Sequence, residues 1–400
     1  MPIPLPAHNS AFGDRHQGGA RPEFRFYFDI VCPYAYLAST QVEGFAERLG
    51  ARIDHRPILH GGVLKSLATA PAARPPAKQA MRRVDVARWA QHFGVELHFP
   101  AEHPRRTVEA MRLLTWAPRL SIPSLMAALY RAYWVEGRDI ADVEVLLDIA
   151  ESVGLLRSEA QKGLLSPAVS QELRRQTDAA IADGVFGVPT FIVEGESGPR
   201  LFFGQDRLIF VEEALRSHPL MRDEGSTRPP RAVAPTPIGE YGAQVANQAR
   251  KLTFVYDLSS PFAYLASTQV EKLAAACGAE VEFFPILLGG LFRSIGTPMV
   301  PISTYPESKR RHALEDMSRW AHHYGVSFHF PSRFPINTVA ALRLLLLAGD
   351  NIAPLTHTLF RLYWVGDQDL GDVQVLERAL SEVGLDPRLI DRVGEPEVKA

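Results

Sequence analysis

The chain contains very little cysteine. Cys32 and Cys277 are the two cysteines among its 400 residues, and no Cys-x-x-Cys pair occurs. A disulfide framework is therefore excluded as the basis of the fold, and a two-cysteine exchange cycle within one domain is unavailable. Cys277 lies in the apolar segment KLAAACGAE, so we expect it to be a buried core residue. Any thiol chemistry then depends on Cys32.

Features of several other classes of protein are also missing. The net charge is −2, so there is no basic excess of the kind that nucleic-acid binding needs. Thirteen histidines are scattered without the spacing of metal ligands, and no glycine-rich phosphate loop occurs. The longest apolar stretch, residues 342–349, is far shorter than the ~20 residues of a membrane span. These absences predict a cytoplasmic protein with no metal, membrane or nucleic-acid partner.

What the chain does contain is an internal repeat. Residues 33–43 read PYAYLASTQVE and residues 261–271 read PFAYLASTQVE, with ten identities in eleven positions. HFGVELHFP (92–100) matches HYGVSFHFP (323–331) in the same way, so the repeated unit has the size of a domain. We predict a disordered leader over 1–22, a first domain over 23–218, a proline-rich linker over 219–250 and a second domain over 251–400.

The same pattern of elements is expected in both copies at first. Each begins with an aromatic and β-branched strand and continues into a helix that starts at Pro33 or Pro261. A second strand and a long region of helical periodicity follow. The first copy alone then returns to strand, in GVFGVPTFIVEG and RLFFGQ, and ends in the helix DRLIFVEEALRSH. The second copy reaches Ala400 before such segments, so we expect it to be C-terminally incomplete.

The two copies differ at the residue before the helix proline, which is Cys32 in one and Ser260 in the other. A strand that leads into a helix places this side chain beside unpaired backbone N–H groups and the positive end of the helix dipole. This position would lower the pKa of the Cys32 thiol and activate it as a nucleophile. The Ser260 hydroxyl would instead donate a hydrogen bond to the thiolate of another molecule. The alternative for Cys32 is a small buried structural residue.

These motifs together resemble the DsbA-like thioredoxin superfamily, and within it the kappa-class glutathione transferases and the 2-hydroxychromene-2-carboxylate isomerases. The resemblance rests on FDIVCPYAYLA, FGVPTF and FGQDRLIFVEEAL in the first copy, and on YDLSSPFAYLA and DMSRWAHHYGVSFHFP in the second. It implies an α/β, thioredoxin-like fold with an all-helical insert, present as two tandem copies. The second copy would lack the C-terminal strands and helix of the fold.

The resemblance further implies glutathione as the cofactor and indicates where it would bind. The family's serine that contacts the glutathione sulfur falls at Ser260 and is replaced by Cys32 in the first copy. The residue before a cis-proline, whose backbone pairs with the cysteinyl part of glutathione, falls at Val188, with Pro189 as the proline. Both copies therefore hold part of the expected site.

The remaining glutathione contacts are divided between the copies. Gln205 and Asp206 fall where the family holds the γ-glutamyl end of glutathione, and a carboxylate opposite an α-ammonium is physically sensible there. The second copy keeps Asn337, a further candidate for glutathione binding, where the first copy has Arg106. No counterpart of Gln205 or Asp206 occurs in the second copy, so we expect the first copy to be the active half.

These interpretations predict a glutathione-dependent thiol enzyme that acts on small electrophilic or aromatic compounds, as an isomerase, a transferase or a thiol oxidoreductase. Either Cys32 attacks the substrate itself, or bound glutathione adds to an unsaturated ring and leaves again. The alternative from another class is a non-catalytic binding protein, in which a tandem pseudo-dimer carries decayed sites. The duplication favours an intramolecular pseudo-dimer or a homodimer, and the sequence does not name the substrate.

Overall fold

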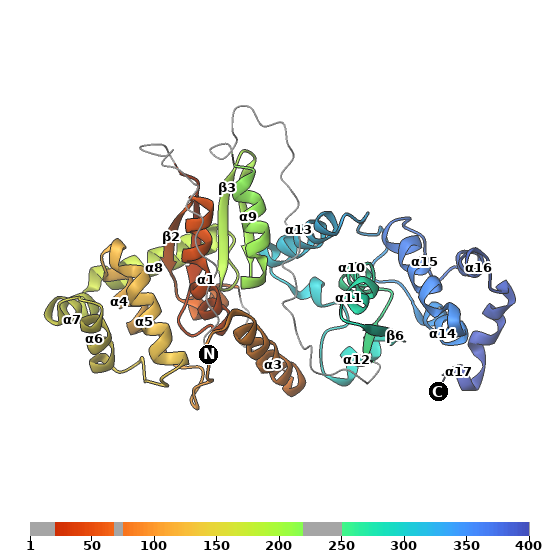
Figure 1. Ribbon diagram of the computed structural model, residues 1–400, viewed down its shortest axis with the longest axis horizontal. Coiled ribbons are helices and arrows are strands. Elements are labelled where there is room, and N and C mark those ends of the chain that lie inside the picture. The colour runs from red at the N-terminus through yellow and green to blue at the C-terminus, as the bar shows by residue number, and fades with distance from the viewer. Residues whose placement is uncertain (1–20, 68–74, 219–249, 400) are drawn as a thin grey trace. The chain divides into compact units, whose positions relative to one another are not determined.

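The computed structural model describes residues 21–67, 75–218 and 250–399 (Figure 1). These residues form two compact units, which are described one at a time: 21–63 with 86–218, and 64–67 and 75–85 with 250–399. Residues 1–20 of the predicted leader and 219–249 of the predicted linker lie outside the described residues.

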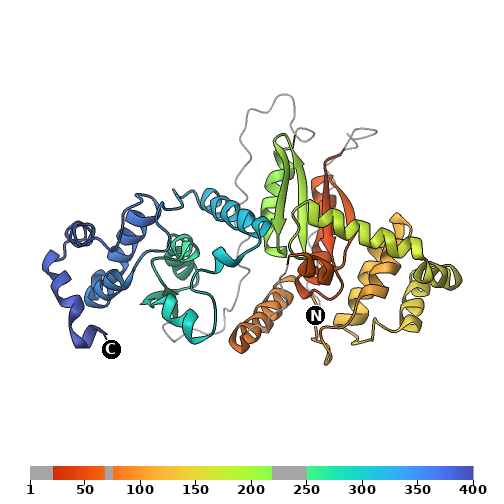
Figure 2. The ribbon, with the colours of Figure 1, turned by 180° about the vertical axis from the view of Figure 1, so that it is seen from behind.

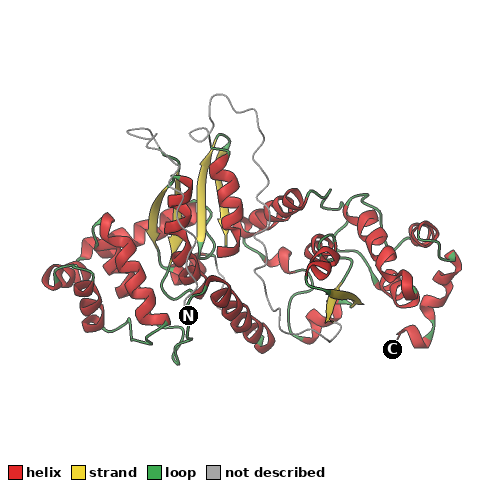
Figure 3. Cartoon of the chain, viewed as in Figure 1, coloured by secondary structure: helices red, strands yellow, loops and turns green. Residues whose placement is uncertain are grey.

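The first unit is built on a four-stranded sheet in the order β2-β1-β3-β4 (yellow in Figure 3). Its strands are β1 (Glu23–Phe28), β2 (Arg52–Pro57), β3 (Thr190–Gly195) and β4 (Gly198–Phe203). β1 pairs with β2 in parallel and with β3 antiparallel, and β3 pairs with β4 antiparallel. The predicted return to strand after the helical region is therefore confirmed.

Helices fill the sequence between β2 and β3. They are α2 (His60–Ser66) and α3 (Pro76–Phe93), parts of which belong to the second unit, then α4 (Val108–Trp116), the 3-10 turn η1 (Arg119–Ser121), α5 (Ile122–Trp134), α6 (Val143–Ser152), α7 (Arg157–Leu165) and α8 (Pro167–Ala182). Helix α1 (Pro33–Leu49) lies between β1 and β2. The turn η2 (Gln205–Arg207) and α9 (Leu208–Arg216) follow β4, and α9 packs on β3 and β4. Figure 2 shows this arrangement from behind. The expected all-helical insert is present.

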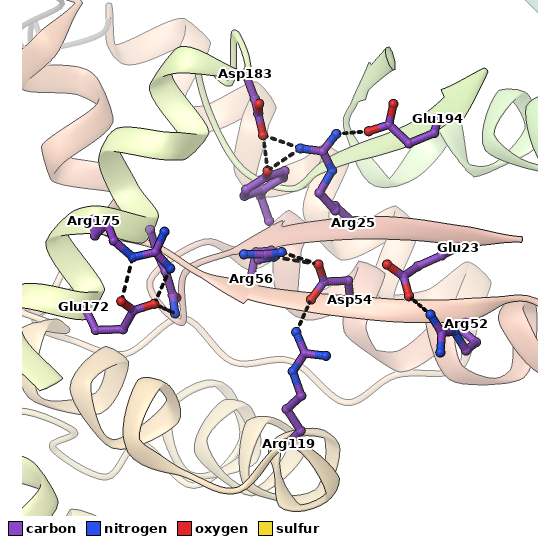
Figure 4. Close-up of polar contacts among 12 residues, drawn as sticks. Glu23, Arg25, Arg52, Asp54, Arg56, Arg119, Glu172, Arg175, Asp183 and Glu194 are labelled. Atoms are coloured by element: carbon purple, nitrogen blue, oxygen red, sulfur yellow. Dashed lines mark hydrogen bonds and ion pairs between the residues drawn. The ribbon is translucent and has the colours of Figure 1, made fainter. Parts of the chain in front are cut away.

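The two faces of the sheet are stabilised differently. On one face, aromatic side chains from neighbouring strands stack, and the rings of Phe26 and Phe191 lie 5.2 Å apart with an interplanar angle of 9°. On the other face, charged side chains pair: Arg25 contacts Asp183 and Glu194 (Figure 4). α8 contacts β2. One face therefore supplies hydrophobic core, and the other joins a helix and a strand through ion pairs.

The second unit repeats the first half of this fold. Its strands β5 (Arg250–Tyr256) and β6 (Ala279–Pro285) pair in parallel, and residues 286–399 contain no further strand. Its helices are α10 (Pro261–Ser267), α11 (Val270–Ala276), α12 (Leu288–Ser294), α13 (Glu307–Tyr324), α14 (Val339–Leu347), α15 (Ile352–Trp364), α16 (Val373–Glu382) and α17 (Pro396–Lys399), with 3-10 turns η4 (Pro301–Thr304), η5 (Gly349–Asn351) and η6 (Pro387–Gly394). As expected, this copy has fewer strands than the first.

One sheet face of the second unit is open in the described part of the chain. Val255 on β5 is 52% exposed and Phe284 on β6 is 53% exposed. They stand where the first copy has Tyr27, which donates to Asp183, and Arg56, which pairs with Asp54. The second copy therefore has apolar side chains on the face where the first copy has polar pairs.

Two details of the second unit differ from the sequence-based expectation. The almost identical repeat segments form one continuous helix, α1, in the first copy but two helices, α10 and α11, in the second. In the first copy η2 and α9 pack on α1, and they have no counterpart among residues 250–399. The prediction that Cys277 is a core residue is wrong: Cys277 is exposed. It follows the last residue of α11 and ends that helix, where its side chain is not needed to fill the core.

Candidate functional site

The site is built around the start of α1. Cys32 is the N-cap residue of α1, with extended backbone angles of φ −95° and ψ 116°, and Pro33 occupies the first turn. The Sγ–H of Cys32 donates to the carbonyl O of Val188 at 3.2 Å. The peptide bond between Val188 and Pro189 is cis, as the family resemblance implies. The thiol and the loop before β3 therefore lie in direct contact.

Strand register explains why these segments meet. Tyr27 of β1 pairs with Thr190, the first residue of β3, and Thr190 pairs in turn with Phe203, the last residue of β4. The chain leaves β1 toward Cys32, enters β3 from Pro189 and leaves β4 toward η2. All three segments therefore lie at one end of the sheet.

Gln205 and Asp206 lie in η2 at this same end. The N–H of Gly204, just before them, donates to the carbonyl O of Pro189 at 3.0 Å, and η2 contacts α1. Gln205 is buried, with 4% of its surface exposed, and Asp206 pairs with the guanidinium of Arg207. The structure thus brings five predicted residues of the first copy, from Cys32 to Asp206, into one region of a single unit.

Ser260 holds the corresponding place in the second copy but makes a different contact. Its backbone angles, φ −94° and ψ 117°, match those of Cys32, and its hydroxyl oxygen accepts from the N–H of Ala263 at 3.2 Å. Cys32 makes no such capping hydrogen bond. The capping bond uses a lone pair and leaves the hydroxyl hydrogen, so donation from Ser260 to a thiolate stays a prediction.

Asn337 lies in the second unit. It is exposed, and its Oδ1 accepts from the N–H of Val339 at 3.0 Å, at the start of α14. The corresponding Arg106 of the first copy pairs with Glu109 at 2.7 Å. A role of Asn337 toward glutathione therefore stays a prediction.

A buried aspartate organises the backbone of the site, and the sequence reasoning did not identify it as functional. The carboxylate of Asp29 accepts from the N–H groups of Val31 at 3.2 Å and His60 at 2.9 Å, while its carbonyl O accepts from the N–H of Cys32 at 3.1 Å. Burial raises the pKa of Asp29, although the hydrogen bonds from His60, Val31 and Thr107 oppose this. Asp29 thereby joins the end of β1 to α1 and α2.

The second copy contains the same arrangement, an aspartate clamp in which one buried carboxylate accepts backbone N–H groups from two chain segments. Asp257 accepts from the N–H groups of Ser259 at 2.9 Å and Leu288 at 2.8 Å, and from the hydroxyl of Thr338 at 3.0 Å. Asp29 and Asp257 occupy equivalent positions after the first strand of each copy, in FDI and YDL. A polar residue repeated at the end of an apolar strand was the available signal.

A tryptophan of the helical insert bonds the loop that follows the first strand of each copy. Trp134 donates from Nε1 to the carbonyl O of Ile30 at 2.9 Å, and Trp364 donates in the same way to Leu258 at 2.9 Å. Both tryptophans are fully buried. These tryptophans, which occupy the same position in the two copies, therefore belong to the hydrophobic core of their units.

Two further properties concern only the described part of the chain. None of its helices combines the length and apolar character that crossing a membrane would require. Within the same residues, no group of three or more His, Cys, Asp or Glu side chains is arranged to hold a metal ion.

The family follows from comparison with known proteins. The model of the DSBA-like thioredoxin domain matches residues 24–216 and again residues 251–398. The chain therefore belongs to the DSBA-like thioredoxin domain family and carries the domain twice.

Individual relatives resemble about half of the chain. It is 30% identical to 2-hydroxychromene-2-carboxylate isomerase of Pseudomonas putida over 194 residues, which cover 48% of this chain and 92% of the relative. It is 27% identical to human glutathione S-transferase kappa 1 over 202 residues, or 47% of this chain and 88% of the relative. A solved structure of 2-hydroxychromene-2-carboxylate isomerase is 29% identical, with a TM-score of 0.44, over 48% of this chain and 94% of that one.

Proposed function

We propose that the first copy is a glutathione-dependent thiol enzyme whose nucleophile is Cys32. The observation that supports this most directly is the 3.2 Å contact between Cys32 Sγ and Val188 O, beside cis-Pro189 at the start of α1. A thiol at a helix N-terminus is suited to react as thiolate. A backbone segment beside it is suited to bind an extended peptide such as glutathione.

Glutathione would lie along the end of the sheet. In the proposed complex the backbone of Val188 pairs with the cysteinyl part of glutathione, which brings the glutathione sulfur to Cys32. Gln205 and Asp206 lie on the next segment, and the Asp206 carboxylate would bind the α-ammonium of the γ-glutamyl end. Asp206 already pairs with Arg207, and this guanidinium would orient the carboxylate in the complex.

The chain has one cysteine in this site, so we propose a single-thiol reaction. The Cys32 thiolate attacks the glutathione sulfur of a mixed disulfide; the disulfide bond of the substrate breaks, and a Cys32–glutathione disulfide forms. The released thiolate takes a proton from water. A glutathione thiolate then attacks the bound glutathione sulfur, oxidised glutathione leaves, and Cys32 returns to the thiolate. The cytoplasm supplies reduced glutathione, so we propose that location.

A second candidate is isomerisation of a small unsaturated ring compound. It is favoured by the 30% identity to a 2-hydroxychromene-2-carboxylate isomerase. Glutathione would add to the substrate, allow rotation about the weakened bond and leave again, while Cys32 only contacts the bound sulfur. Cys32→Ser should abolish disulfide exchange but retain isomerisation, so one variant separates the two reactions.

Protection of Cys32 from alkylation tests the shared step, glutathione binding. In the full chain with Cys277→Ser, Cys32 is the one remaining thiol, and its reaction with iodoacetamide can be followed by mass spectrometry. S-methylglutathione, which forms no disulfide, should slow the reaction. Asp206→Asn should weaken this protection about tenfold, since a charge-assisted hydrogen bond is lost. Asp178→Asn, exposed on α8, should not change it.

The result also decides between catalysis and mere binding. If millimolar S-methylglutathione gives no protection, the proposed function is wrong, and the non-catalytic alternative gains support. If protection is found but neither disulfide exchange nor isomerisation occurs, the chain binds glutathione without the proposed chemistry.

A further inference from the structure

In each copy an aromatic residue at the end of the first strand packs against an aromatic residue of the helical insert. One of the two rings is a tyrosine, but it is the helix residue in the first copy and the strand residue in the second. In the first copy, Phe28 ends β1 and packs against Tyr130 of α5, with ring centroids 6.4 Å apart at 43°. In the second, Tyr256 ends β5 and packs against Phe360 of α15, 5.8 Å apart at 42°. All four rings are almost fully buried. The two rings thus pack in the same way in both copies, while the hydroxyl group lies on the helix residue in the first copy and on the strand residue in the second.

The change redirects the hydroxyl to a different partner. In the second copy, the Tyr256 hydroxyl bonds the hydroxyl of Thr356 on α15. In the first copy, the Tyr130 hydroxyl donates to the carbonyl O of Asp29 at 3.3 Å. The amide of Cys32 donates to that same oxygen at 3.1 Å. A buried phenol therefore shares an acceptor with the backbone amide of the proposed nucleophile, and it does so only in the copy whose N-cap residue is a cysteine.

We infer that Tyr130 is a positioning residue for the thiol chemistry of Cys32, whose hydroxyl turns from the Asp29 carbonyl to the Cys32 sulfur when the thiol loses its proton. This inference rests on the proposed role of Cys32 as the nucleophile.

The hydrogen bonds around Asp29 keep the free-energy cost of moving the Tyr130 hydroxyl to the Cys32 sulfur small. While Cys32 is a thiol, its Sγ–H donates to Val188. After deprotonation the sulfur has no hydrogen to donate and becomes an acceptor that needs a donor. The Asp29 carbonyl O keeps the amide of Cys32 as a partner, so the Tyr130 hydroxyl can rotate away without leaving a buried acceptor unsatisfied.

Tyr130 remains a donor through neutral pH. Burial raises the pKa of Tyr130 well above its usual range, and negative charge on Cys32 and Asp29 raises it further. The phenol therefore keeps its hydrogen while the neighbouring sulfur loses one. A hydrogen bond to an ionised acceptor is stronger than one to a neutral carbonyl, which favours the thiolate.

Other ionisable groups lie on the elements around this pair. Asp29 and His60 are bonded to each other at the end of β1 and the start of α2, the ring of Tyr36 on α1 stacks on Tyr130 with centroids 5.4 Å apart, and Asp206 pairs with Arg207 in η2, which contacts α1. The second copy has Leu288 in the position of His60. A test must therefore change the phenol and leave these groups in place.

Tyr130→Phe makes this change, because it removes one oxygen and installs the residue that the second copy already holds at Phe360. In the full chain with Cys277→Ser, the rate of alkylation of Cys32 by iodoacetamide is measured across pH. We expect the midpoint to rise by about one pH unit in Tyr130→Phe, which lowers the thiolate fraction below the midpoint about tenfold. Tyr133→Phe, one turn along α5 with its hydroxyl toward His103, should leave the midpoint unchanged.

An unchanged midpoint in Tyr130→Phe overturns the inference. Should this variant fold poorly, the triple variant Phe28→Tyr/Met126→Thr/Tyr130→Phe carries the ring pair of the second copy together with the threonine that its tyrosine bonds, and should show the same rise. The assay contains no glutathione, so its result is separate from the protection experiment. Protection without a midpoint shift removes the role of Tyr130 alone, and a midpoint shift without protection removes glutathione binding alone.

Discussion

Cys32 Sγ lies 3.2 Å from the carbonyl O of Val188, and this contact joins the start of α1 to the loop before β3. The contact takes the thiol away from the amides of its own helix. Ser260, with the same backbone angles, keeps its side chain on those amides instead. In the first copy the N-cap side chain therefore bonds the neighbouring loop. In the second copy, where residues 250–399 contain no counterpart of that loop, it bonds its own helix.

Cys32→Ser should therefore separate stability from reactivity. A serine at this N-cap should accept from the N–H of Ala35, as Ser260 accepts from Ala263, and stabilise the first unit by about 0.5–1 kcal/mol. Disulfide exchange should be abolished, because the nucleophile is gone. Calorimetry and an exchange assay measure the two effects, with Cys277→Ser as the control that changes neither. A lower melting temperature in Cys32→Ser would contradict the expected cap.

Ser260→Ala should destabilise the second unit. The substitution removes the capping hydrogen bond to Ala263, which costs about 1 kcal/mol. Ser318→Ala, exposed on α13, should stay within about 0.5 kcal/mol of the parent. Both values come from thermal unfolding followed by circular dichroism. Equal stability of Ser260→Ala and the parent would show that the cap contributes nothing.

Asp29 should give the folded protein a specific pH dependence. Burial raises the pKa of this carboxyl in the folded state, so the folded state binds its proton more tightly than the unfolded chain does. Between the unfolded pKa of about 3.9 and the raised folded pKa, the free energy of unfolding should then fall as pH rises.

Asp29→Asn should lack this contribution. Denaturant unfolding of the parent and the variant at a series of pH values gives the difference in unfolding free energy. That difference should move in favour of the variant as pH rises above about 4. A difference that is independent of pH would mean that the pKa of Asp29 is the same in both states.

Gly204→Ala should disturb the predicted glutathione contact at Asp206. Gly204 has φ +107°, and an added Cβ would lie 2.6 Å from Asp206 Oδ1. Gly198, with φ +105°, has no atom within 4 Å of its added Cβ. Both alanine variants should lose about 1–3 kcal/mol through backbone strain, but Gly204→Ala alone should also lose protection of Cys32 by S-methylglutathione. Equal protection in both variants would contradict a binding role for Asp206.

Local sequence patterns were sufficient for the order of elements in each copy. The proline after Cys32 correctly marks the first turn of α1, and the segment around Pro189 correctly leads into β3. The smaller number of strands in the second copy was expected, because segments that match β3 and β4 do not occur within residues 251–399. These features depend on turn chemistry and periodicity, which a single sequence displays directly.

Features that depend on tertiary packing were not predictable in this way. The segment shared by α1 and α10 differs in helix continuity although its residues are almost identical. Cys277 lies in an apolar segment yet faces solvent at a helix end. Asp29 acts as a clamp because the end of β1, the start of α1 and the start of α2 meet in the fold. The sequence alone does not show that these segments lie together.

The aspartate clamps of the two copies, Asp29 and Asp257, affect how the N-cap position beside them can change in evolution. Asp29 and Asp257 hold the loop through backbone amides, not through the side chain of the N-cap residue. The backbone angles at Cys32 and Ser260 accordingly agree to within a degree. An N-cap position whose geometry is fixed by its neighbours can exchange a hydroxyl for a thiol without rebuilding the scaffold. Such a position is evolvable: after duplication, one copy can sample new chemistry while the other keeps the old residue.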